Sequence, residues 1–138
     1  MIQEIIEKWN NHKSDLENYF RTHKQEEYNT YVLIVKKIIE IIINTGEDYE
    51  KYNFKKLLVI DDGIYQGTQI FITHKDYYQP SVKDYIYTSN YYGSCPGCDT
   101  LQSIQEENEE GYPTENQIKD YLTLSLHLIQ KFRRMTDE

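Results

Sequence analysis

The chain contains two cysteines, and both stand in one Cys-Pro-Gly-Cys segment, at Cys95 and Cys98. Two thiols at this spacing can form a redox pair, supply half of a tetrahedral zinc site, or act as small apolar residues in a tight structural elbow. In a redox pair, Cys95 would be the nucleophile and Cys98 the resolving thiol. In a zinc site, Asp61, Asp62 or Asp99 could add an oxygen ligand, or a second chain could add its own thiols. The residues leave all three interpretations open.

Strand-like residues precede the Cys segment. Runs of β-branched and aromatic residues predict strands at Lys55–Asp61, Gln66–His74 and Lys83–Tyr92. Asp62-Gly63 between the first two runs is a strong signal for a tight turn. Short connections favour an antiparallel meander.

A meander has a geometric consequence for the Cys segment. The third strand would end beside the hairpin that joins the first two, so we expect the thiols near Asp61, Asp62 and Tyr65. His74 would lie at the far end of the second strand, away from the thiols. Two carboxylates close to the thiols would disfavour a thiolate, which counts against redox chemistry.

Apolar spacing and capping residues predict the helices. They are expected at 2–22, 25–44, 99–106 and 114–133, with Asp99 and Thr114 as N-caps. The fold class is therefore α+β: a small antiparallel meander sheet of about three strands, packed by N-terminal and C-terminal helices. We expect a single domain over 1–138, with a helical part at 1–46, the sheet at 54–92, the Cys loop and short helix at 93–110, and the C-terminal helix at 114–135.

The composition argues against several classes of partner. The formal net charge is −8 and no basic stripe is present, so we expect no binding of nucleic acid. No basic region followed by an apolar run opens the chain, and its most apolar stretch is too short and too charged to span a bilayer. We therefore expect a cytoplasmic protein, in a bacterial host or an infected cell, without membrane contact.

Tyrosine is unusually abundant, with 14 residues. A tyrosine ring suits half-exposed walls and interfaces better than deep cores, because its hydroxyl requires a hydrogen-bond partner. In the third strand, Tyr85, Tyr87 and Tyr91 should share one face, and Ile86 and Tyr92 the other. The expected binding surface consists of Asp61, Asp62, Tyr65, Tyr85, Tyr87, Tyr91 and Tyr92.

No phosphate loop, nucleophile elbow or His-containing metal motif is found, which argues against an enzyme. The preferred interpretation is a small acidic protein-binding module, with the Cys segment as a structural elbow or zinc clasp. The alternatives are a thiol–disulfide oxidoreductase that uses Cys95 and Cys98, and a zinc-stabilised homodimer. The expected cofactor is accordingly none, or zinc held by Cys95, Cys98 and Asp99, and the expected partner is a protein.

Two segments, Y-Q-G-T-Q-I-F and Y-G-S-C-P-G-C-D, resemble a loose group of small uncharacterised proteins from phages and bacteria. The resemblance covers Asp61 to about Leu101. Pro96 stands where that group often has Ser. The resemblance implies a phage, mobile-element or bacterial cytosolic setting, such as an inhibitor, immunity or anti-defence factor. It supplies no catalytic residues.

Overall fold

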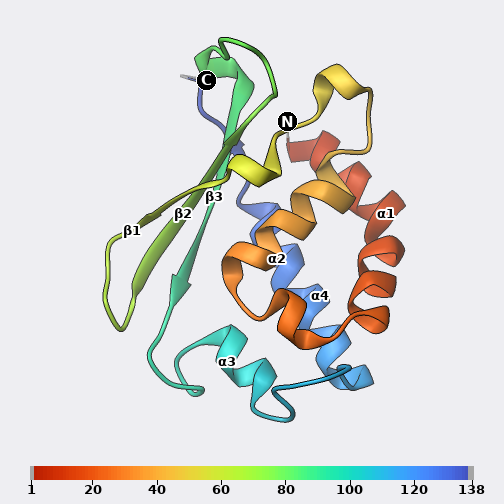
Figure 1. Ribbon diagram of the computed structural model, residues 1–138, viewed down its shortest axis with the longest axis vertical. Helices are drawn as coiled ribbons and strands as arrows, with labels where there is room; N and C mark the ends of the chain where they lie inside the picture. The colour runs from red at the N-terminus through yellow and green to blue at the C-terminus, as the bar shows by residue number, and fades with distance from the viewer. Residues whose placement is uncertain (1, 137–138) are drawn as a thin grey trace.

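The computed structural model describes residues 2–136 and has two layers. Figure 1 shows α1, α2 and α4 gathered on one side of an antiparallel sheet. The sheet has four strands in the order β1-β2-β3-β4, so the expected α+β meander is confirmed. Its strands are β1 (Leu58–Asp61), β2 (Gly67–His74), β3 (Tyr85–Tyr92) and β4 (Arg133–Arg134).

The expectation of about three strands was one too few. The C-terminal helix ends at Gln130, short of the predicted 133–135, because the next residues turn back on the helix. Phe132 N–H donates to the Ile129 carbonyl (3.2 Å), and Met135 N–H then donates to the carbonyl of Tyr85 (3.1 Å). Between these two bonds, Arg133 and Arg134 pair with β3 as β4.

The first and third strands begin later than predicted. In front of them stand single 3₁₀ turns, Phe54–Lys56 before β1 and Val82–Asp84 before β3. In the second of these turns the Asp84 carboxylate accepts the backbone N–H of Ser81 (2.9 Å). This local bond diverts the first residues of the predicted strand from the sheet.

The helices are α1 (Ile2–Thr22), α2 (Tyr31–Ile38), α3 (Thr100–Gln105) and α4 (Glu115–Gln130). The predictions for α1 and for the caps at Asp99 and Thr114 are confirmed. No helix among residues 2–136 is long and apolar enough to cross a membrane.

The single helix predicted at 25–44 was wrong. Gln25–Tyr28 form a 3₁₀ turn, and the chain restarts at Thr30, whose side chain accepts the N–H of Leu33 (3.2 Å). A hydroxyl at this position caps a new helix, so the break has a local cause. Ile39–Ile43 then widen into a π-helical turn.

The core lies within the helical layer and between that layer and the inner face of the sheet. Phe20, Tyr28 and Tyr121 form an aromatic cluster with ring centroids 4.9–5.3 Å apart, and all three are fully buried. The buried Thr88 hydroxyl donates to the Leu128 carbonyl (2.8 Å), which ties β3 to α4.

The two faces of the sheet differ in burial. Phe71, Ile86 and Thr88 point toward the helices and are almost fully buried. We call the opposite side the outer face. It carries Leu58, Ile60, Ile70, Ile72, Tyr85, Tyr87 and Tyr91, which alternate with the buried positions. The helices cover one face only. Most positions of the outer face are apolar or aromatic, and Thr68, His74, Ser89 and Arg133 also lie on it.

This one-sided burial predicts that an Ile→Ala substitution costs much more stability on the inner face of the sheet than on the outer face. Ile86→Ala should lower the free energy of unfolding by about 2–5 kcal/mol, because Ile86 is fully buried against the helices. Ile60→Ala should lower it by less than about 1 kcal/mol, because Ile60 on the outer face is 47% exposed. Urea titration of both variants measures the difference. Equal losses would contradict the assignment of the faces.

Candidate functional site

The strand register brings the Cys loop beside the β1–β2 hairpin. Gly67 pairs with Tyr92, and the Tyr92 hydroxyl donates to the Asp61 carboxylate (2.6 Å). His74 pairs with Tyr85 at the opposite end of the sheet, so it lies away from the Cys loop as expected.

The two aspartates of the hairpin are bound to their own loop. Asp61 also accepts the N–H of Gly63 (2.9 Å), and Asp62 accepts the N–H of Thr68 (2.7 Å). The tight turn expected at Asp62-Gly63 is replaced by a longer loop over 62–66, because these carboxylates hold its backbone open. The hydrogen bond from Tyr92 holds the pKa of Asp61 below its ordinary value, and the same bond raises the pKa of Tyr92 to about 12.

The buried carboxylate of Asp99 joins the Cys loop to two helices. It accepts hydrogen bonds from the Tyr31 hydroxyl in α2 (2.9 Å), the Gly93 N–H (3.0 Å) and the Gln102 N–H in α3 (2.9 Å). The Tyr31 hydroxyl in turn accepts the N–H of Leu101 (3.1 Å). Burial is the main cause that raises the pKa of Tyr31 to about 12. Each polar group in this network has a partner, as burial requires.

The two cysteines are free, exposed and side by side. Cys98 N–H donates to the Cys95 carbonyl (3.0 Å), and Cys95 N–H donates to Cys98 Sγ (3.0 Å). The contact between the thiols lowers the pKa of Cys98 and raises that of Cys95. Cys98 is therefore the more acidic thiol. The assignment of Cys95 as the nucleophile stays a prediction.

Gly93 fixes the entry to this loop. A Cβ at Gly93 would lie 2.2 Å from the Cys98 carbonyl oxygen and 2.9 Å from Cys98 Sγ. The backbone of one end of the loop thus packs directly against the other end, which leaves no room for a side chain.

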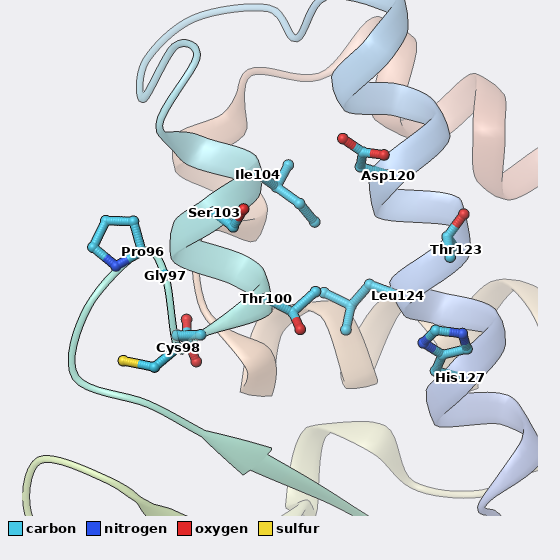
Figure 2. Close-up of a pocket in the computed structure, with 11 residues that line it drawn as sticks. Pro96, Gly97, Cys98, Thr100, Ser103, Ile104, Asp120, Thr123, Leu124 and His127 are labelled. Carbon is cyan, nitrogen blue, oxygen red and sulfur yellow. The ribbon is translucent and has the colours of Figure 1, made fainter.

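A cavity of about 530 Å³ lies between α3 and α4, next to the Cys loop. Thr100 and Ser103 of α3 and Asp120, Thr123 and His127 of α4 line it. Figure 2 shows Asp120 extending toward α3, while the sulfur of Cys98 is directed away from His127. A Cys–His pair is therefore not formed. The polar lining could accommodate a small hydrophilic molecule.

A smaller cavity, of about 240 Å³, lies on the other side of Asp99. Gln69 lines it and pairs across the strands with Asn90. The Oε1 atom of Gln69 and the Nδ2 atom of Asn90 are buried and have no hydrogen-bond partner within residues 2–136. The Gln69 oxygen is an acceptor and the Asn90 nitrogen is a donor, so a water molecule could bind to these two atoms.

The residues predicted to bind a partner separate into two sets. Tyr65 at the tip of the hairpin is 80% exposed and Tyr91 is 57% exposed, and Tyr85 and Tyr87 are half-buried on the outer face. The predicted alternation within the third strand is thus confirmed. The side chains of Tyr92 and Asp61, in contrast, are hydrogen-bonded to each other.

The remaining histidines can now be placed. His12 contacts Asp15 (3.1 Å), His23 stacks on Tyr19 (4.1 Å between ring centroids), and His127 lines the larger cavity. Within the described part of the chain, no three His, Cys, Asp or Glu side chains converge as a metal site would require. The zinc and oxidoreductase interpretations stay predictions.

Sequence reasoning missed Tyr31 and His127 as parts of this site. Tyr31 is 68 positions from Asp99 in the chain, so no local pattern could join the two. His127 occurs on an amphipathic helix, and periodicity does not show which helix faces it.

Comparisons with family models, curated proteins and solved structures found no match to this chain.

The Asp99 network generates a stability prediction. Asp99→Asn should lower the free energy of unfolding by about 1–3 kcal/mol, because the new amide N–H₂ would face backbone N–H donors. Asp120→Asn, at an exposed position of α4, is the matched control and should change it by less than about 0.5 kcal/mol. Chemical denaturation compares the two, and indistinguishable midpoints would show that Asp99 does not hold the loop.

The thiol pair generates a second prediction. Brief iodoacetamide treatment near neutral pH should alkylate Cys98 before Cys95, because the thiolate reacts and the pKa of Cys98 is the lower one. As the pH rises toward the pKa of an ordinary thiol, the preference for labelling Cys98 over Cys95 should shrink. Peptide mapping of singly modified protein by mass spectrometry measures the order. Predominant labelling of Cys95 would reverse the assignment.

Proposed function

We propose that this protein is a protein-binding module that adds an extended segment of a partner to the free edge of β1, with the outer face supporting the contact. The observation that supports the proposal is the apolar outer face next to an unpaired strand edge. Antiparallel sheets usually place polar residues on a face that meets water. A contiguous apolar face is instead typical of an interaction surface.

The outer face is most exposed at β1 and the hairpin. Leu58 is 56% exposed, Ile60 is 47% exposed and Ile64 in the hairpin loop is 88% exposed. Leu58 pairs with Ile72 and Ile60 with Ile70, so the apolar side chains continue onto β2. Leu58 and Ile60 would therefore offer apolar contact to a strand that pairs with β1.

The edge of β1 also offers backbone groups. Asp62 N–H donates to the Thr68 carbonyl (3.2 Å). This bond shows which residues of β1 direct their backbone N–H and C=O groups toward β2 and which direct them toward the open edge. Residues 58, 60 and 62 direct their backbone groups toward β2, so Val59 and Asp61 direct theirs toward the open edge. An incoming strand can bond to these groups, as in β-strand addition.

The charges at the two ends of β1 indicate which partner segment would pair with it. Lys55 and Lys56 precede β1, and Asp61 and Asp62 end it. An antiparallel segment that begins with basic residues and ends with acidic ones would place opposite charges beside each other. The net charge of −8 disfavours a second copy and favours a partner that is basic overall.

The biological setting that the resemblance implies fits this proposal. An inhibitor, immunity or anti-defence protein of a phage or mobile element acts by binding another protein in the bacterial cytosol. No catalytic step is part of the proposal.

A pair of capped octapeptides tests it. KKIVTIEE places its lysines beside the aspartates when it lies antiparallel to β1, and EEITVIKK has the same composition in reverse order. KKIVTIEE should bind about tenfold more tightly at low salt, measured by fluorescence anisotropy, because only this order matches the charges. Equal binding of both peptides, or binding of neither, would overturn the proposal.

Two isoleucine variants locate the contact. Ile60→Lys should weaken binding of KKIVTIEE by about tenfold or more, because it places a charge within the outer face. Ile6→Lys is the matched control, since Ile6 has a similar exposure of 43% and belongs to α1 and not to the outer face of the sheet. It should leave binding unchanged. An equal loss in both variants would show that the peptide binds elsewhere.

A further inference from the structure

The Cys loop presents two sulfur atoms to solvent from one turn. The Cys98 N–H to Cys95 carbonyl bond closes the turn, and the Cys95 N–H to Cys98 Sγ bond holds the second sulfur over it. Both cysteines are exposed and unpaired by any disulfide. The loop therefore has the form of a bidentate dithiol.

The ends of the loop are fixed before any ligand arrives. The Asp99 carboxylate binds the Gly93 N–H (3.0 Å), and the Gln102 side chain donates to the Gly93 carbonyl (3.1 Å). The Cys98 backbone packs against Gly93 too closely to admit a Cβ. A ligand would thus meet sulfurs whose backbone is already ordered, which reduces the entropic cost of binding.

The oxygen and nitrogen donors of the neighbourhood are engaged or turned away. Asp99 accepts three hydrogen bonds, from Tyr31, Gly93 and Gln102. Asp61 likewise accepts from Tyr92, Gly63 and Gln69. In Figure 2 the Cys98 sulfur points away from His127. The site therefore presents soft sulfur ligands, and recruiting Asp99 would break the bonds that order the loop.

This donor set discriminates between metals. Zinc requires four ligands, and the turn supplies two thiolates. A hard cation would require the carboxylates that the chain already uses. Thiolates are soft ligands that select Cu(I). Cu(I) is a d¹⁰ ion that can be coordinated linearly, so two thiolates can complete its coordination.

We propose that Cys95 and Cys98 form a two-thiolate site for a soft monovalent metal ion, with Cu(I) as its probe. Both thiols lose their protons on coordination, so binding of one Cu(I) releases two protons. No electron is transferred in this step. Asp99 acts as a positioning residue that holds the turn and does not coordinate the ion.

Anaerobic competition between the reduced protein and a chromogenic Cu(I) chelator tests the site. We expect one Cu(I) per chain, and a loss of affinity of about a hundredfold or more in both Cys95→Ser and Cys98→Ser. Ser103→Ala, at an exposed position of the adjacent helix α3, is the matched control and should retain the stoichiometry. Circular dichroism of each variant checks that the fold is retained.

Three outcomes would overturn the proposal. The first is Cu(I) binding that survives in both serine variants, and the second is no competition at equimolar chelator. The third is zinc bound at one ion per two chains with a dimeric mass, which would assign the thiols to a shared tetrahedral site. Because the metal measurement uses no peptide, it stands or fails independently of the contact proposed at β1.

Discussion

The buried carboxylate of Asp99 is the interaction on which the functional end of the molecule depends. Its two oxygens accept three donors that come from α2, from the Cys loop and from α3. Without it, the backbone N–H groups of Gly93 and Gln102 would lose their hydrogen-bond acceptor, which is costly for donors that are at least partly buried. Asp99 also lines both cavities, so the same buried residue contributes to the wall of each.

Much of the fold followed from local patterns. The long amphipathic helix α1, the antiparallel meander and the caps at Asp99 and Thr114 each depend on residues within a few positions of one another. Periodicity and capping chemistry act over that range. The neighbourhood of the Cys loop was predictable for the same reason, since it required only the topology of three consecutive strands.

The features that escaped prediction depend on contacts between distant parts of the chain. The hydroxyl groups of Tyr28 and Tyr121 make deep burial acceptable because Phe20 O and Gln25 Oε1 accept from them (3.0 and 2.7 Å). A tyrosine-rich composition alone suggested half-exposed walls, since it does not reveal such partners. The strand β4 is a similar case: nothing in two consecutive arginines indicates a strand until β3 offers an edge to pair with.

The two ends of the described chain lie together. Arg134 contacts Glu4 (3.8 Å), and Figure 1 places the start of α1 and the last described residues opposite the tip of the β1–β2 hairpin. Anything fused before α1 or after β4, whether a natural neighbouring domain or an affinity tag, would therefore emerge from the same pole. Such a fusion would leave the thiols and the hairpin unobstructed, and the chain could be immobilised by either terminus with its opposite pole facing the solution.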